Sequence, residues 1–380
     1  MKKLFSILFI FCFSFVSAQQ SPNTRWTEAQ ADAWYAKQPW LFGSNYNPAS
    51  AINQLEMFQE DTFSPEEIDK ELGWAEDMGV NTARVYLHDL LWADSEGFKN
   101  RLNQFLDICA KHNIRPVLVL FDSCWDPHPK SGPQRAPQPG IHNSGWLQSP
   151  GASALNDPSQ HPRLEAYVTG VVGAFANDSR ILMWDVWNEP DNTNDNSYGK
   201  NHLKQEPENK REKVAMLLPR VFAWARAAQP SQPLTSGLWI FNKNRDMSIP
   251  ENWSTTEKIQ VENSDILTFH HYSDAESFEG VIKQLQTLKR PMICTEFMAR
   301  GANSLFQTHL PIARKYNVGM INWGFVAGKT QTYLPWDSWQ KPYINGRVPK
   351  IWFHEILKTD GTPIDPAEIA AIKAATGKTK

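Results

Sequence analysis

The sequence is poor in cysteine. Four cysteines occur in 380 residues, and one of them, Cys12, lies in an apolar N-terminal stretch. The others are Cys109, Cys124 and Cys294, which allow one disulfide with one thiol left over, without indicating the pairing. No two cysteines have the Cys-x-x-Cys spacing of a metal site. We therefore expect no cysteine-based metal centre.

The sequence also lacks a strong excess of charge of either sign and the residue spacings that are typical of metal sites. The formal net charge is only −3, which gives no reason to expect nucleic acid or an anionic membrane as a partner. The histidines show no tight spacing such as His-Glu-x-x-His. We expect neither a metal nor another cofactor, and the sequence does not indicate an oligomeric state.

The one strongly apolar terminal run is short. The chain opens with MKKLFSILFIFCFSFVSAQQ, in which Lys2 and Lys3 precede an apolar core at 4–16 and small residues up to Ala18. That core is shorter than the roughly 20 residues that a membrane helix needs. The pattern predicts a signal peptide over residues 1–18, with export to the periplasm or the exterior and no membrane insertion.

What the chain does have is a regular alternation of short apolar runs and helical patterns. The runs predict strands at 41–46, 81–86, 115–121, 180–187, 233–239, 265–271, 291–295 and 318–323. Helical periodicity lies between most of them, at about 65–79, 95–112, 162–176, 208–227, 274–288 and 303–316, and most weakly at 240–264. Continuous apolar runs are typical of parallel strands covered on both faces.

This alternation predicts the α/β class and a (β/α)8 TIM barrel in a single domain, residues 19–380. A doubly wound open sheet is the alternative, which we disfavour because no glycine-rich phosphate turn follows the first strand. The segment TEAQADAWYAKQ predicts a helix under the barrel floor, and a last helix is expected near 349–357 before a polar tail.

Three long connections, 122–161, 191–207 and 324–348, all follow predicted strands. In a TIM barrel such connections lie on the catalytic face. The sequence is also rich in tryptophan, with 16 residues. Those at strand ends or in loops are Trp125, Trp146, Trp239, Trp323, Trp336 and Trp339. They suggest a platform for a flat apolar ligand face.

Polar residues stand at the ends of several predicted strands. They are Arg84 on the second, Asn188-Glu189 on the fourth, His270 and Tyr272 on the sixth, Glu296 on the seventh and Trp323 on the eighth. Alone, each has an ordinary structural explanation, such as a barrel ion pair or a core histidine. Together they bring two carboxyl groups to one barrel mouth, which is what glycoside cleavage needs.

The other residues fit supporting roles. Arg84 can keep one glutamate ionised, and Tyr272 can donate a hydrogen bond to it. Asn188 can bind a sugar 2-hydroxyl, and Trp323 and Trp125 can stack on sugar rings. Asp185, two residues before Trp187, is expected to be a buried carboxylate paired with an arginine, with a place in the site as the alternative.

These motifs resemble clan A of the retaining glycoside hydrolases, and most closely its family 5 cellulase and mannanase group, over about residues 40–357. The resemblance implies that Glu189, in Asn-Glu-Pro, is the acid/base and that Glu296 is the nucleophile. It implies two carboxyl groups about 5–5.5 Å apart. The acid needs a raised pKa, which we attribute to Trp187 and Trp239.

One family feature is missing. Family 5 members usually carry a histidine at the end of the third strand, where this chain reads VLFDSCWDPHP. Asp122, His88 or His128 are the candidates to replace it.

The substrate class stays open among β-linked glucan, mannan and xylan. The 122–161 loop would either block the cleft, giving exo action, or extend it. The alternatives are a non-catalytic carbohydrate-binding barrel, a transglycosylase that uses the same intermediate, and a metal-dependent hydrolase that uses histidines. The available histidines are His88, His128, His142, His270 and His271.

Overall fold

The computed structural model describes residues 24–195, 207–242 and 244–378. The predicted signal peptide and residues 196–206 of the predicted 191–207 loop lie outside the described residues.

Eight parallel strands form one sheet in the order β5-β4-β3-β2-β1-β8-β7-β6. Their bounds are β1 Phe42–Asn45, β2 Thr82–Tyr86, β3 Val117–Val119, β4 Met183–Asp185, β5 Leu234–Thr235, β6 Leu267–His270, β7 Met292–Glu296 and β8 Gly319–Asn322. Backbone hydrogen bonds from Leu238 to Thr268 (2.9 Å) and from His270 to Leu238 (2.8 Å) join the ends of the order. The sheet is thereby a barrel, as predicted, and each predicted strand overlaps an observed one, with β7 ending one residue beyond its predicted range.

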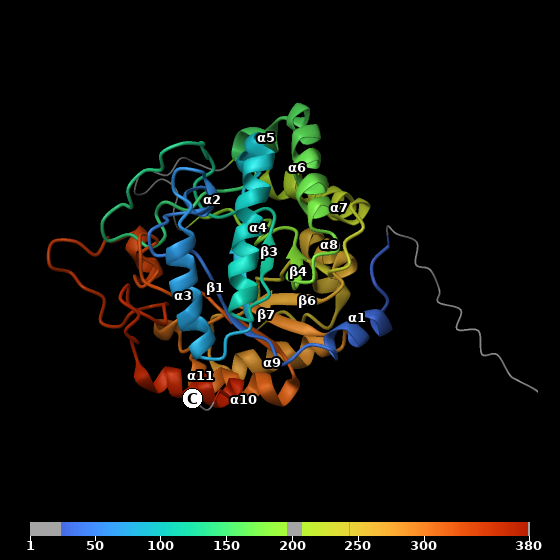
Figure 1. The fold of residues 1–380 in the computed structure, drawn as a ribbon. Coiled ribbons are helices and arrows are strands. Elements are labelled where there is room, and N and C mark those ends of the chain that lie inside the picture. The colour runs from blue at the N-terminus through green and yellow to red at the C-terminus, as the bar shows by residue number, and fades with distance from the viewer. Residues whose placement is uncertain (1–23, 196–206, 243, 379–380) are drawn as a thin grey trace, which may run out of the picture.

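Helices surround the barrel (Figure 1). The α-helices are α1 Glu28–Tyr35, α2 Gln54–Phe58, α3 Pro65–Asp77, α4 Ser95–Lys111, α5 Ala152–Asn156, α6 His161–Ala174, α7 Lys210–Ala227, α8 Thr255–Asn263, α9 Ala275–Gln286, α10 Phe306–Tyr316 and α11 Pro366–Thr376. Short 3-10 helices are η1 Asp89–Asp94, η2 Pro158–Gln160, η3 Pro250–Asn252, η4 Arg300–Ala302 and η5 Trp336–Trp339. The weakly predicted 240–264 segment does contain a helix, α8.

The core divides between the two faces of the strands. Leu118 and Trp184 belong to the large cluster that the strands share with the helices. Their chain neighbours Val117 and Met183 belong to a smaller cluster inside the barrel, because successive strand residues point to opposite faces. Tyr35 of α1 joins this inner cluster, which confirms the helix under the barrel floor.

The helix predicted near 349–357 does not form. The guanidinium of Arg300 binds the backbone carbonyls of Trp352, His354 and Glu355 at 2.7–2.9 Å. These carbonyls are therefore held by a side chain and not by amides four residues later, as a helix requires. The polar tail instead forms α11, which packs beside α10 at the C-terminal end of the chain (Figure 1).

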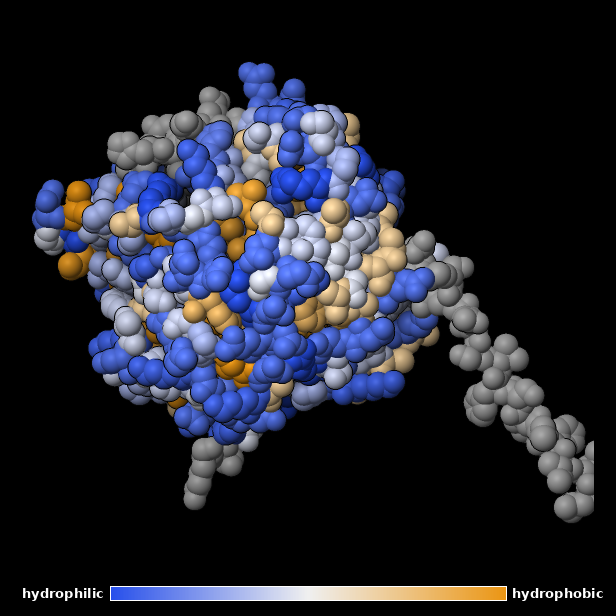
Figure 2. All heavy atoms as spheres, turned by 45° about the horizontal axis from the view of Figure 1, so that its top comes forward, coloured by the Kyte–Doolittle hydropathy of each residue, from blue (hydrophilic) through white to orange (hydrophobic). Residues whose placement is uncertain are grey.

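The view in Figure 2 is mostly hydrophilic, with apolar side chains in small separate groups. Within the described part of the chain, no helix combines the length and the apolar character needed to span a membrane.

Candidate active site

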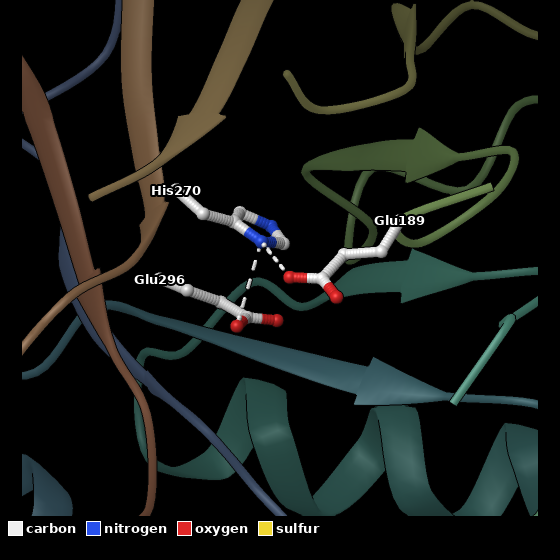
Figure 3. A group of neighbouring side chains, drawn as sticks. All are labelled: Glu189, His270 and Glu296. Carbon is white, nitrogen blue, oxygen red and sulfur yellow. Dashed lines mark hydrogen bonds and ion pairs between the residues drawn. The ribbon is translucent and has the colours of Figure 1, made fainter. Parts of the chain in front are cut away.

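The two predicted carboxylates face each other at the mouth of the barrel. Glu296 is the last residue of β7, and Glu189 follows β4 by four residues. Glu189 has a φ of 41°, a left-handed conformation that costs a non-glycine residue about 1–2 kcal/mol. One oxygen of each carboxylate and one ring nitrogen of His270 all lie within 4.8 Å of one another (Figure 3). The backbone of Glu189 thus has an energetically unfavourable conformation, and the carboxylate of this residue faces Glu296.

Donors from three residues fix Glu296. Its Oε1 accepts hydrogen bonds from Arg84 Nη1 (2.9 Å) and the Tyr86 hydroxyl (3.0 Å). Its Oε2 accepts from the Tyr272 hydroxyl at 2.8 Å. The Glu296 side chain is nearly buried, so these three donors fix its orientation. Arg84 also supplies the positive charge that pairs with its carboxylate.

Arg84 lies at the centre of the polar network. It donates to Asp185 from Nε (3.1 Å) and Nη2 (2.7 Å), and both side chains are fully buried. This confirms that Asp185 is a buried carboxylate paired with an arginine. Arg84 also donates to Asn45 Oδ1 (2.9 Å) and Asn188 Oδ1 (2.8 Å). One guanidinium therefore ties together the ends of β1, β2, β4 and β7.

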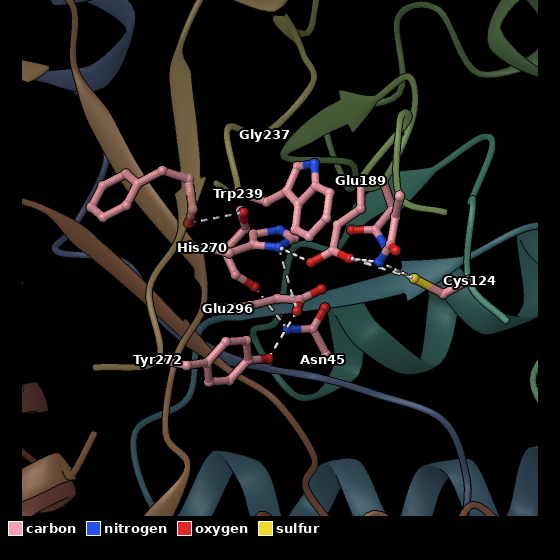
Figure 4. Close-up of polar contacts among 12 residues, drawn as sticks. Asn45, Cys124, Glu189, Gly237, Trp239, His270, Tyr272 and Glu296 are labelled. Atoms are coloured by element: carbon pink, nitrogen blue, oxygen red, sulfur yellow. Dashed lines mark hydrogen bonds and ion pairs between the residues drawn. The ribbon is translucent and has the colours of Figure 1, made fainter. Parts of the chain in front are cut away.

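Glu189 has a different environment. Burial raises the pKa of its carboxyl group. Nδ2 of Asn192 donates to Oε2 at 2.6 Å and opposes this rise, and Sγ of Cys124 lies 3.5 Å from the same oxygen (Figure 4). A buried carboxyl group with a raised pKa is suited to act as an acid.

The two tryptophans expected to shield Glu189 separate in the structure. Trp239 lines the cleft beside Glu189, as predicted (Figure 4). Trp187 instead packs in the outer core against Phe121, with 5.2 Å between ring centroids. The predicted strand ran to residue 187, whereas β4 ends at Asp185, so the alternation of strand faces does not extend to Trp187.

His270 lies between the carboxylates. Its Nδ1 is 2.9 Å from Glu189 Oε1 and 3.5 Å from Glu296 Oε2 (Figure 3). Burial lowers the pKa of the imidazole to about 4, so the ring is neutral near pH 7. Because carboxylate oxygens accept hydrogen bonds, the ring proton belongs on Nδ1.

Tryptophans line a cleft of about 1090 Å³ around the carboxylates. The tryptophans that line it are Trp125, Trp146, Trp239, Trp323 and Trp336. Trp339, predicted to join this platform, is fully buried behind Trp125, with 5.7 Å between ring centroids. Five of the six tryptophans predicted to form the platform thus line one cleft, and the sixth, Trp339, packs against Trp125.

Asp122 occupies the place at the end of the third strand. Asn188 Nδ2 donates to its Oδ1 (2.9 Å), and Trp146 Nε1 donates to its Oδ2 (2.6 Å). Burial raises the pKa of Asp122 to about 7. His88 is buried, with its Nδ1 3.3 Å from Asp89 Oδ1. Neither His88 nor His128 lines the cleft. Of the three candidates, only Asp122 reaches the site.

Among the described residues, sequence reasoning missed three that contact the carboxylates, Tyr86, Cys124 and Asn192. It also missed Asn45, which accepts hydrogen bonds from Arg84 and Tyr86. Asn45 ends β1, and Tyr86 lies two residues after Arg84 on β2, so the rule that strand residues i and i+2 share a face could have found Tyr86. Cys124 and Asn192 lie in irregular connections, where no periodic signal exists. Cys109, Cys124 and Cys294 are all free thiols.

Glu189, His270 and Glu296 are close enough to hold a metal ion. However, the Arg84 guanidinium is already bound to Glu296, and a second cation there would be repelled. His271 points elsewhere, with Nε2 3.0 Å from the Ser277 hydroxyl. The described side chains fit hydrogen bonding to a neutral ligand better than metal coordination.

Comparison with known proteins identifies the family. The sequence matches the family described as Cellulase (glycosyl hydrolase family 5) over residues 49–342. The chain belongs to glycosyl hydrolase family 5. It is a glycoside hydrolase with the family's (β/α)8 barrel, as its strand-end motifs implied. A search of curated protein sequences finds no match.

Solved structures agree with this fold. The exo-β-1,4-mannosidase of Opitutaceae bacterium strain TAV5 aligns with a TM-score of 0.57 at 19% identity, over 89% of this chain and 60% of its own. The endo-β-1,4-mannanase of Thermotoga petrophila gives 0.56 at 14%, over 90% and 77%. The endo-1,4-β-mannanase of Rhizomucor miehei gives 0.54 at 11%, over 88% and 98%. This family 5 chain therefore spans less than two thirds of the exo-mannosidase.

Proposed function

We propose that this family 5 protein is a retaining β-glycoside hydrolase in which Glu296 is the nucleophile and Glu189 the acid/base. The observation that carries the proposal is that oxygens of the two carboxylates lie within 4.8 Å. Retaining enzymes place their carboxyl groups about 5–5.5 Å apart, whereas inverting enzymes need about 6.5–9.5 Å to admit a water molecule. The short separation supports direct attack by a carboxylate.

In the first step, Glu296 attacks the anomeric carbon while Glu189 gives its proton to the glycosidic oxygen. The bond to the leaving sugar breaks, and a covalent glycosyl-enzyme forms. The hydrogen bonds from Arg84, Tyr86 and Tyr272 hold the attacking carboxylate in place. The raised pKa of Glu189 supplies the protonated acid.

In the second step, the ionised Glu189 removes a proton from water, which attacks the same carbon and releases Glu296. Two inversions give overall retention. Nδ1 of His270, close to both carboxylates, can stabilise whichever of them bears negative charge. A sugar in place of water would give transglycosylation from the same intermediate.

The substrate we propose is a β-1,4-linked mannoside. The tryptophan-lined cleft suits the apolar face of a β-linked pyranose ring, which glucans, mannans and xylans all offer. The names of the similar structures, which are those of a β-1,4-mannosidase and β-1,4-mannanases, favour the mannan class. The N-terminal sequence supports export of the enzyme to meet an external polysaccharide.

The test is hydrolysis of aryl β-mannoside, β-glucoside and β-xyloside by purified protein, with the anomer of the first product read by NMR. We expect β-mannoside cleavage to give the β-anomer first, to survive chelation, and to be lost in Glu296→Gln. Release of the α-anomer would contradict the retaining mechanism. Binding of mannan without hydrolysis of any glycoside would favour the carbohydrate-binding barrel, and loss of activity on chelation the metal-dependent hydrolase.

A further inference from the structure

The two long loops on the catalytic face, residues 122–161 and 324–348, are joined to each other. Hydrogen bonds link Asn143 N to Thr330 O (2.7 Å), His142 N to Ser338 Oγ (2.9 Å), Tyr343 N to Gly140 O (2.8 Å) and Gln331 Nε2 to Gln138 O (2.8 Å). Trp125 of the first loop also packs on Trp339 of the second. We call the two joined loops the wall. In the first loop these hydrogen bonds lie at residues 138–143, so this segment and the second loop form one joined surface.

The part of the wall around Trp146 and Trp336 lies on the nucleophile side of the carboxylate pair, whereas Cys124 of the first loop contacts Glu189. Its Trp146 packs against Tyr86, with 5.1 Å between ring centroids, and its Trp336 packs against Tyr272 at the same distance. Tyr86 and Tyr272 are the two hydroxyl donors to Glu296. The wall therefore begins directly behind the groups that hold the nucleophile.

This position decides which part of a substrate meets the wall. In the proposed mechanism the attacked sugar binds over Glu296 and Trp323, which both line the cleft, and the leaving group departs past Glu189. Trp323 packs against Trp146 of the wall, with 6.1 Å between ring centroids. The attacked sugar, on the non-reducing side of the scissile bond, is thus the sugar that faces the wall.

The cleft continues on the other side of Glu189. There it is lined by residues of the β5 and β6 connections and of α9, including Phe241, Asn242, Arg245, Ser277 and Gln284. Among the described residues, the lining of the cleft therefore includes the β5 and β6 side of the barrel as well as the wall.

The wall also presents one group that can recognise the end of a sugar chain. His142 lines the cleft, and its Nδ1 is 2.8 Å from the carbonyl oxygen of Leu334. A carbonyl only accepts, so Nδ1 carries the proton. Burial lowers the pKa of His142 to about 4, so the neutral ring keeps Nε2 as an acceptor. A terminal hydroxyl can donate to it.

We propose that this enzyme is exo-acting: the wall leaves room for a single sugar on the non-reducing side, and His142 accepts a hydrogen bond from that terminal sugar. This inference rests on the proposed function and deepens it. A chain that continued beyond the attacked sugar would have to pass through the joined loops.

The experiment follows a reducing-end-labelled pentasaccharide of the sugar whose aryl glycoside is cleaved. We expect the label to move to the tetrasaccharide, then to the trisaccharide, with free monosaccharide as the only other product. Early appearance of shorter labelled products, or shortening by two sugars, would overturn the inference while leaving the proposed function intact. Failure to cleave any aryl β-glycoside would overturn both.

A matched pair of glycine variants tests the wall itself. Gly140 and Gly132 both lie in the 122–161 loop with positive φ, 73° and 92°. A Cβ at Gly140 would collide with the backbone of Tyr343, whereas a Cβ at Gly132 meets nothing within 4 Å. Gly140→Ala should therefore push the loops apart and produce internal cleavage, while Gly132→Ala keeps terminal cleavage. Identical product patterns in the two variants, with Gly140→Ala folded by circular dichroism, would contradict the wall.

Substitution of His142 tests the recognition of the terminal sugar. His142→Phe removes the acceptor and should lower kcat/KM on the pentasaccharide about five-fold, as expected for one neutral hydrogen bond. The loss should appear in KM, with kcat little changed. His142→Gln can donate to Leu334 and still accept, so it should recover most of the loss. Equal kcat/KM in all three proteins would remove His142 from the proposal.

Discussion

Nδ1 of His270 lies 2.9 Å from Oε1 of Glu189, a residue on a different strand end 81 positions earlier in the chain. The same nitrogen is 3.5 Å from Glu296 Oε2. One neutral donor is therefore within reach of both carboxylates. During double displacement the negative charge moves from one of these two groups to the other. His270 can donate to whichever carboxylate is charged without a change of position.

The roles of the two glutamates can be separated with azide as an external nucleophile. In Glu296→Gly, azide can attack the anomeric carbon of an activated β-glycoside directly, which gives an α-glycosyl azide. In Glu189→Ala, the glycosyl-enzyme still forms from an activated substrate, and azide then gives a β-glycosyl azide. NMR of the products reads the configuration, and azides of the opposite configurations would reverse the assignment.

Glu189→Gln should make the reaction depend on the leaving group. The loss of proton donation should cost roughly 10² to 10⁴-fold on an oligosaccharide, as is typical for general acid catalysis. A dinitrophenyl glycoside needs no proton, so its first turnover should survive as a burst, followed by slow hydrolysis because the base is also missing. Stopped-flow absorbance measures the burst. An equal loss on both substrates would argue against Glu189 as the acid.

The alkaline limb of the pH profile should report Glu189. The acid must be protonated, so kcat/KM should fall as pH rises through the raised pKa of Glu189. The Asn192 amide stabilises the ionised form through its 2.6 Å hydrogen bond to Oε2. Asn192→Ala should therefore raise this pKa and move the alkaline limb upward by about one pH unit. An unchanged or downward shift would show that the limb belongs to another group.

Glu355 should make folding stability depend on pH. Burial raises the pKa of its carboxyl group from 4.5 to about 8. Between these values the folded chain binds a proton that the unfolded chain has released, so the free energy of unfolding contributed by this group falls as pH rises. The loss is at most about 1.4 kcal/mol per pH unit.

Glu355→Gln, which stays neutral, should remove this part of the slope between about pH 5 and 8. Urea unfolding at a series of pH values measures it. The exposed Glu60→Gln is the matched control and should keep the slope of the unsubstituted protein. A Glu355→Gln slope equal to that of the control would show that Glu355 does not hold an extra proton in the folded state.

The sequence predicted the barrel and its mouth because both depend on repeated local signals. Apolar runs of four to eight residues mark buried parallel strands, and a polar residue at the end of such a run must face the barrel mouth. Arg84, Glu189, His270, Tyr272, Glu296 and Trp323 were all placed by this rule, and the structure brings them around one cleft.

What the sequence could not predict depends on contacts between distant segments. The expected helix near 349–357 does not form, and its backbone carbonyls instead accept hydrogen bonds from Arg300. No local sequence pattern shows such a contact. Trp187 packs in the outer core because β4 ends at Asp185, two residues before the end of the predicted strand. The joining of the two long loops likewise rests on hydrogen bonds between residues about 190 positions apart.

The hydrogen bonds of Arg84 also affect how substrate-binding energy is used in catalysis. The guanidinium is fully buried and is held by Asp185, Asn45, Asn188 and Glu296. The dipoles and charge around the nucleophile are therefore preorganised, and none of them has to turn when charge develops on the sugar. Binding energy from the leaving-group side can then go into distorting the attacked ring instead of assembling the site.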